Sequence, residues 1–264
     1  MCDKISFIDI TTIKENSINE SISNDSEVID ALSKIKVMTP QLMSKISFSC
    51  GLIQDQQVYY LSFNGGKDCL AAYIILKYYL YCKENSKDYS EIESYESFVS
   101  SNYHSDKIVF LYFISDKHFE CEEDYVINFV KQEKVKMLFC YSTYVNGLNY
   151  ILKQHSVNYI VMGTRYDDIK NAADASMISQ TLSQESTKPY PEFLRFYPVF
   201  NFSYSEIWRL ILSSNSYYLK LYDFGFSSIG DKFNTKINQY LYVNERKVYP
   251  AWYLKEEQSE RAFR

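Results

Sequence analysis

Several residue types and patterns are scarce in this chain of 264 residues, and each scarcity argues against a class of protein. The six cysteines form no C-x-x-C pair and no Cys/His cluster with zinc-ligand spacing. The net charge of −5 argues against a nucleic-acid-binding protein, which usually has a basic surface. No basic segment followed by an apolar one begins the chain, and Lys77 interrupts the longest apolar stretch. We therefore expect a cytoplasmic protein that binds neither nucleic acid nor membrane.

Strand-like and helix-like patterns alternate from residue 58 onward. Short apolar runs at 58–63, 107–113, 136–141 and 158–162 predict strands, and residues 68–82, 122–132 and 145–154 predict the helices between them. This alternation predicts an α/β fold, a doubly wound, mostly parallel sheet with flanking helices. Residues 83–106 are polar and predict an insertion loop with some helix, whereas 205–213 predict an amphipathic helix capped by Ser203 or Ser205.

The chain divides into three predicted segments. Residues 1–50 form an N-terminal helical extension, in which 26–50 have helical spacing of apolar residues and the part before them is mostly polar. Residues 51–230 form the nucleotide-binding domain, and residues 231–264 form a tail that packs on its core. The apolar residues at 250–254 favour a docked tail, and a frayed basic end is the alternative.

Glycine is scarce, with seven residues in the chain, so the pair Gly65 and Gly66 is informative. It lies in the sequence LSFNGGKDC, residues 61–69, where the first predicted strand turns into a helix. Glycines allow the backbone to approach a ligand closely, and the N-terminus of the helix favours a phosphate. Lys67 adds a positive charge, but the spacing differs from the Walker motif G-x-x-x-x-G-K-[ST]. A turn that merely requires two glycines is the alternative interpretation.

This segment resembles the pyrophosphate loop of the adenine-nucleotide α-hydrolase superfamily, and most of all its eukaryotic FAD synthetase branch. Further segments resemble the same branch in the same order, and five of the seven glycines fall inside the five segments. They are GTRYDD at 163–168, YPEFLR at 190–195 with Pro198 and Trp208, LYDFGFSSIG at 221–230 with Asn234 and Thr235, and PAWYL at 250–254 with Glu260, Arg261 and Arg264. The resemblance covers residues 58–264 and implies transfer of AMP from ATP to FMN, with Mg²⁺, to give FAD and pyrophosphate.

The resemblance and the residue chemistry together assign roles to individual side chains. The candidate catalytic residues are Asn64, Asp68, Asp168 and Arg261, and Asp68 is also the candidate Mg²⁺ ligand. The candidate residues for ATP and its phosphates are Ser62, Phe63, Gly65, Gly66, Lys67, Asp116, Gly163, Arg165 and Arg195. The candidate flavin-binding residues are Asp168, Trp252, Arg261 and Arg264, so the tail completes the flavin site. Capping or a turn is the alternative role for Asp168, a surface salt bridge for Arg195 and core packing for Trp208.

One departure from the family pattern leaves alternatives open. The family usually has a second Asp shortly before the Tyr-Pro block, where Leu182 stands here and Glu185 is the nearby carboxylate. A nucleotide- or flavin-binding protein without turnover therefore remains an alternative. Reduction of PAPS needs a nucleophilic cysteine, usually near the C-terminus, but no cysteine follows Cys140. A tRNA-modifying ATP pyrophosphatase would need a basic surface or paired catalytic cysteines. We expect a monomer that acts on small molecules.

Overall fold

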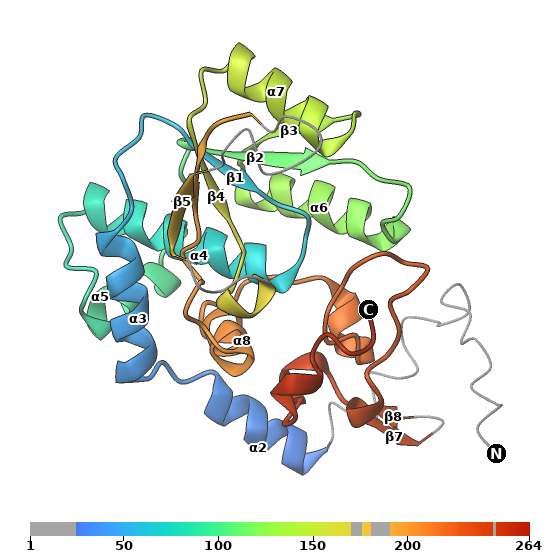
Figure 1. Cartoon of the computed structure of the whole chain (residues 1–264). Coiled ribbons are helices and arrows are strands. Elements are labelled where there is room, and N and C mark those ends of the chain that lie inside the picture. The colour runs from blue at the N-terminus through green and yellow to red at the C-terminus, as the bar shows by residue number, and fades with distance from the viewer. Residues whose placement is uncertain (1–24, 170–175, 181–190, 245–246) are drawn as a thin grey trace.

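A six-stranded sheet forms the centre of the computed structural model, which describes residues 25–169, 176–180, 191–244 and 247–264 (Figure 1). The strand order is β3-β2-β1-β4-β6-β5. The strands β1 (Tyr59–Ser62), β2 (Ile108–Phe113), β3 (Lys136–Cys140), β4 (Tyr159–Met162) and β6 (Leu194–Phe196) are parallel, and β5 (Ile178–Gln180) is antiparallel to β6. The predicted doubly wound, mostly parallel sheet is confirmed.

Helices cover both faces of the sheet, because alternate strand residues point to opposite sides. On one face, Leu61 and Phe110 join a core with α4 (Lys67–Glu84), α6 (Glu120–Glu133), α8 (Tyr204–Ser213) and α3 (Pro40–Gly51). On the other face, Leu111 and Ile160 pack against α7 (Tyr144–Gln154). The crossover between β3 and β4 therefore changes face, and the winding direction reverses between β1 and β4. Ligands of such folds bind at this switch point, beyond the carboxyl ends of the strands.

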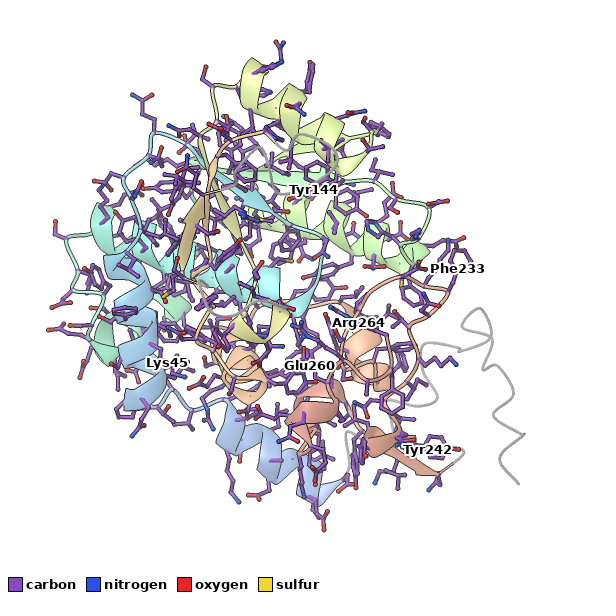
Figure 2. All side chains as sticks on the ribbon, viewed as in Figure 1. Lys45, Tyr144, Phe233, Tyr242, Glu260 and Arg264 are labelled. Atoms are coloured by element: carbon purple, nitrogen blue, oxygen red, sulfur yellow. The ribbon has the colours of Figure 1, made fainter. Side chains whose placement is uncertain are left out.

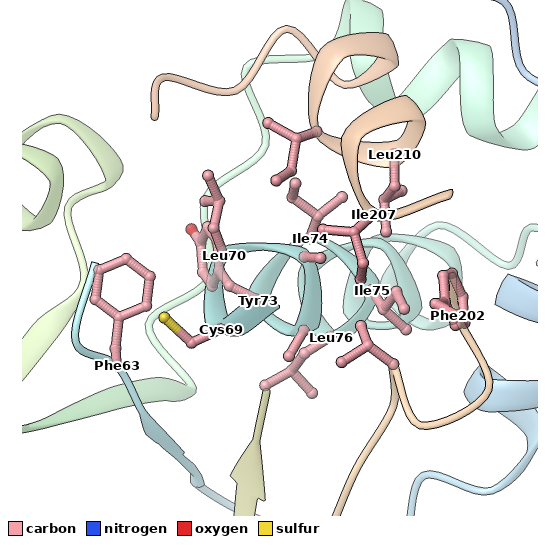
Figure 3. Packing of buried hydrophobic residues seen from close by; sticks show 14 of the residues in the cluster. Phe63, Cys69, Leu70, Tyr73, Ile74, Ile75, Leu76, Phe202, Ile207 and Leu210 are labelled. Atoms are coloured by element: carbon pink, nitrogen blue, oxygen red, sulfur yellow. The ribbon is translucent and has the colours of Figure 1, made fainter. Parts of the chain in front are cut away.

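Helix α4 is buried around almost its whole circumference, as its apolar sequence predicts. Figure 3 shows Ile74 and Ile75 of this helix close to Ile207 and Leu210 of α8. This packing holds the start of α4, which directly follows the glycine pair, against the centre of the molecule. The candidate phosphate-binding loop is therefore followed directly by a deeply buried helix.

The N-terminal region forms two helices, α2 (Ser26–Ile35) and α3, where one continuous helical pattern was expected. Pro40 occupies the first turn of α3 after the N-cap Thr39, and proline favours the start of a helix over its interior. Within 83–106 the structure forms α5 (Ile92–Ser100). Helix α8 begins after Ser203, whose hydroxyl accepts the Glu206 N–H, so the predicted cap is confirmed.

Short elements make up the remaining chain between and after the strands. They are the 3-10 helices η2 (Tyr166–Asp168), η4 (Lys220–Phe224), η5 (Gln239–Leu241), η6 (Ala251–Tyr253) and η7 (Glu257–Ser259), and the hairpin of β7 (Tyr242–Asn244) with β8 (Lys247–Val248). One hydrophobic cluster includes Val28, Leu61 and Leu254, so the described parts of all three predicted segments share a core. Among the described residues, no helix is both long and apolar enough to span a membrane.

Candidate active site

A cavity of about 380 Å³ opens at the carboxyl ends of β1, β2 and β4, at the switch point of the sheet. Most of the predicted site residues meet there, although they come from distant parts of the chain. Those that line the cavity are Ser62, Phe63, Asn64, Gly66, Lys67, Asp68, Gly163, Asp168, Arg261 and Arg264. The structure thus brings the glycine-pair loop, the 163–168 segment and the end of the chain around one space.

The loop before α4 has a tightly defined backbone. Gly65 has a φ of +83°, a conformation that L side chains rarely adopt, and its missing side chain would meet Tyr125. The Asn64 Oδ1 atom accepts the Gly66 N–H at 3.0 Å, and the Tyr222 hydroxyl accepts the Lys67 N–H at 2.9 Å. Two of the backbone donors that were expected to cradle pyrophosphate therefore have internal partners, which a phosphate would displace.

Gly163 allows β4 and α4 to come into direct contact at the cavity. A Cβ atom at this position would collide with the backbone of Asp68 and Cys69 in the first turn of α4. The glycine therefore serves close packing of two elements that line the site. Cys69 itself is buried, and burial raises the pKa of its thiol to about 12, so the thiol is uncharged near neutral pH.

A charged cluster lies beneath the loop and is almost completely buried. The side chains of Lys67 and Arg165 are each 1% exposed. Lys67 Nζ lies 3.0 Å from Asp68 Oδ2, and Arg165 Nε lies 3.0 Å from Asp68 Oδ1. Both cations also contact the carboxylate of Glu260, whose side chain is 6% exposed. Two buried cations thus face two carboxylates, one from the start of α4 and one from the end of the chain.

The cluster keeps Asp68 ionised. Burial raises the pKa of this carboxyl, but the charges of Lys67 and Arg165 outweigh burial and lower its pKa below the usual value of 3.8. The same carboxylates act on Arg165: burial lowers the pKa of its guanidinium, and Asp68 and Glu260 more than restore it. Asp68 is 18% exposed, so one buried ion-pair network holds a charged carboxylate at the cavity.

Asp168 connects the cluster to the end of the chain. One of its oxygens accepts the Arg165 N–H at 2.8 Å, which caps η2, and the other contacts the Arg261 guanidinium. Burial, followed by the nearby charge of Arg165, lowers the pKa of Arg261 to about 10. Arg264 donates to the Ser228 hydroxyl at 2.9 Å. Figure 2 labels Arg264 and Glu260 in the same region of the molecule. Asp168 therefore both caps η2 and lines the cavity. The side chains of Arg261 and Arg264 line the same cavity.

Five predicted site residues are not among those that line the cavity, and one of them, Gly65, lies in the loop before α4. Arg165 lies beneath it in the buried cluster, so its guanidinium faces carboxylates where we had expected phosphate. Arg195 lies within β6, in register with Ile160 of β4. Asp116 is exposed in a turn after β2, and Trp252 lines a second hollow beside α2. The positions Leu182 and Glu185 lie outside the described residues.

Several residues of the site had no assigned role in the sequence, among them Glu260, Tyr222 and His118. Glu260 and Tyr222 fall inside the recognised motif segments, so their positions were visible but their contacts with Lys67 were not. His118 lines the cavity, and its Nδ1 lies 3.1 Å from the Tyr112 hydroxyl. Burial lowers the pKa of His118, which favours the neutral ring. Trp208 is fully buried, as expected for a core residue.

Comparisons with known proteins agree with this geometry. Residues 58–237 match the phosphoadenosine phosphosulfate reductase domain family. The probable FAD synthase of Schizosaccharomyces pombe is 31% identical over 207 residues, which cover 77% of this chain and 70% of that protein. The probable FAD synthase of Caenorhabditis elegans is 25% identical over 235 residues, 88% of this chain and 39% of that protein.

Solved structures share the fold. Candida glabrata FMN adenylyltransferase in complex with FMN and the ATP analogue AMPCPP has a TM-score of 0.66 at 18% identity, covering 89% of this chain and 96% of that one. Yeast FAD synthetase in complex with FAD has a TM-score of 0.65 at 18% identity, with the same coverage of both chains.

Proposed function

The chain belongs to the FAD synthases within the phosphoadenosine phosphosulfate reductase domain family, and from this premise we propose that it transfers the AMP part of ATP to FMN. The products are FAD and pyrophosphate. The observation that carries this proposal is the meeting of the loop before α4, Asp168 and the two arginines Arg261 and Arg264 around one cavity. The N-terminus of α4, which can bind phosphate, lies on one side of this cavity, and the guanidinium groups of Arg261 and Arg264 lie on the other.

ATP occupies the side of the cavity formed by the loop. The positive end of the α4 dipole and the backbone around Gly66 favour the β- and γ-phosphates, which leaves the α-phosphorus toward the acceptor. The phosphates exchange for the Asn64 and Tyr222 oxygens that accept loop N–H groups in the structure. Ser62 and Gly163, at the ends of β1 and β4, complete this side. Asp116 and Arg195 do not line the cavity, so no contact with ATP is assigned to them.

FMN enters from the side of the last residues. Its phosphate is largely ionised near neutral pH, so it attacks the α-phosphorus without a strong general base. Arg261 and Arg264 hold this phosphate dianion next to the anionic ATP, and Asp168 orients Arg261. One P–O bond forms to the FMN phosphate as the bond to pyrophosphate breaks. Catalysis is then positioning and electrostatic stabilisation.

The donor chemistry fits a magnesium ion that is shared with the substrate. Among the described residues, no three His, Cys, Asp or Glu side chains lie close enough to hold a metal. Mg²⁺ commonly takes most of its ligands from phosphate oxygens and water, with one or two carboxylates. Asp68, with Asn64 beside it, is the carboxylate that would contribute, and the bound ion would neutralise charge on the phosphates.

The alternatives from the sequence are weaker. In a PAPS reductase a nucleophilic cysteine is needed, yet Cys50, Cys69, Cys82 and Cys140 are all buried, and no cysteine follows Cys140. A binding protein without turnover would bind ATP and FMN but release no pyrophosphate. The monomeric state and the cytoplasmic location stay predictions, as do the three segment boundaries.

A fluorescence assay tests the proposed function. FAD emits much less light than FMN, so ATP and Mg²⁺ should quench FMN fluorescence as pyrophosphate appears in equal amount. Riboflavin, which lacks the phosphate, should give no product and serves as the matched control. EDTA should stop the reaction. Release of ADP or inorganic phosphate as the first product would contradict AMP transfer, and binding of both ligands without pyrophosphate would indicate the protein without turnover.

A further inference from the structure

Glu260 closes the buried cluster from the far end of the chain. Its carboxylate contacts both Lys67 at the start of α4 and Arg165 before η2. The residue is 5% exposed, and the two cations are 1% exposed. A buried carboxylate between two buried cations is costly to assemble, so its presence calls for an explanation beyond the contacts themselves.

The balance of charges in the cluster explains why Glu260 lies there. Lys67 and Arg165 carry two positive charges, and Asp68 and Glu260 carry two negative ones, so the cluster is neutral before any substrate arrives. Arg261 stands next to it, with its Nε atom 3.8 Å from Glu260 Oε1. Without the Glu260 charge, the cluster would carry one surplus positive charge next to Arg261, and like charges at this distance repel in a poorly hydrated site.

We propose that Glu260 is a positioning residue that holds Lys67 beneath the phosphate loop and shields Arg261, so that Arg261 stays on Asp168 and faces FMN. Lys67 then serves the cluster, and the phosphates are bound by the loop backbone and the arginines. This inference rests on the proposed AMP transfer to FMN, because it assigns Arg261 to the acceptor.

The Glu260 carboxylate is not what holds the last residues on the core, because other hydrogen bonds do so. The Glu260 carbonyl oxygen accepts the Ser227 hydroxyl at 2.7 Å, and the Ser259 carbonyl accepts the Asn238 amide at 3.1 Å. Farther on, the Phe263 carbonyl accepts the Lys236 N–H at 2.7 Å. These bonds persist in Glu260→Gln, which changes the charge of the cluster and little of its shape.

The experiment compares three variants of the full chain: Glu260→Gln, Lys67→Met and the double variant. The first leaves one surplus positive charge, the second one surplus negative charge, and the double variant is neutral again. We expect Glu260→Gln to raise KM for FMN by about tenfold or more while KM for ATP changes less than about threefold. The added Lys67→Met should recover at least about threefold of the lost kcat/KM, because it removes the surplus charge. Glu256→Gln, an exposed carboxamide substitution in the same segment, is the control and should behave like wild type.

Three outcomes decide the proposal. It is overturned if the double variant loses activity by the product of the two single losses, or if Lys67→Met mainly raises KM for ATP, since Lys67 would then bind phosphate. Should Glu260→Gln not fold, thermal unfolding must show the neutral double variant folded, and a double variant that also fails to fold overturns the proposal. An inactive wild-type protein would refute the proposed function instead.

Discussion

Asp68 is the residue on which the candidate chemistry depends most, because its two oxygens meet both buried cations at 3.0 Å while its side chain reaches the cavity. We predict that Asp68→Ala lowers kcat/KM for FAD formation by at least about 100-fold, since the loop loses the carboxylate that faces the phosphates. The folded state should persist with a loss of about 2–4 kcal/mol, as expected when a buried cation loses one partner. Asp167→Ala is the control, because this carboxylate is 73% exposed and lies 3.9 Å from Arg165.

Fluorescence kinetics and circular dichroism measure the two effects separately. A folded Asp68→Ala protein with more than about half of wild-type activity would remove the loop from the active site. The lowered pKa of Asp68 adds a pH dependence. The stability that it contributes is present above its unfolded pKa near 3.8 and is lost as pH falls through the lower folded value.

At the scale of elements, Gly163 permits the contact between β4 and α4. Gly163→Ala should destabilise the fold by about 3 kcal/mol or more and abolish activity, because the added methyl group collides with main chain that cannot move aside easily. Gly51→Ala, at the end of α3, meets only the Tyr89 hydroxyl at 3.6 Å and should be neutral or slightly stabilising. Urea unfolding of both variants checks this prediction, and equal stabilities would refute the close contact.

Helix α6 begins with a buried carboxylate that provides a pH-dependent contribution to stability. Glu122 accepts the Phe119 N–H at 2.6 Å, and burial raises the pKa of Glu122 to about 7. The native state therefore binds a proton between pH 4.5 and 7 that the unfolded chain does not, so this group stabilises less as pH rises through 7. Glu122→Gln should be more stable than wild type at pH 8, and the difference should shrink by pH 5. Thermal unfolding at both pH values measures it, and a constant difference would contradict the shift.

The regular part of the fold could be predicted because its pattern is local. Each of β1 to β4 is a short apolar run, and the helices between them have apolar spacing of their own. By contrast, β5 and β6 have three residues each, and β6 depends on pairing with β4 and β5 on pairing with β6, so no pattern within them was sufficient. The break at Pro40 was visible in the sequence, but the apolar spacing on both sides of it suggested one helix.

The site was predictable as a set of positions and not as a set of contacts. The motif segments marked Asp68, Asp168 and Arg261, which the structure places around one cavity. Glu260, the second partner of Lys67 beside Asp68, is 193 residues away, and nothing in either local sequence specifies that pairing. For the same reason Arg165 had the chemistry of a phosphate ligand, while its burial among carboxylates emerged only in three dimensions.

At the scale of the whole molecule, the last residues couple the two sides of the cavity. Truncation after Gln258 removes Glu260, Arg261 and Arg264 together. We predict that FAD formation falls at least about 1000-fold, since the acceptor loses both guanidinium groups and the cluster loses half of its negative charge. Isothermal titration should show FMN binding lost and ATP binding mostly kept. Near-normal kinetics in the truncated protein would exclude both arginines from the site, and with them the main structural support for a flavin acceptor.

The contacts of Glu260 also bear on the order in which the molecule assembles. They join positions 193 and 95 residues apart, so they close long loops that become favourable only after the sheet between them has formed. During refolding from denaturant, the helical signal should therefore return before the ability to bind FMN. A partly folded species of this chain would have its nucleotide loop in place while the flavin side was still open. We predict that the last kinetic step of folding is the step that makes FMN binding possible.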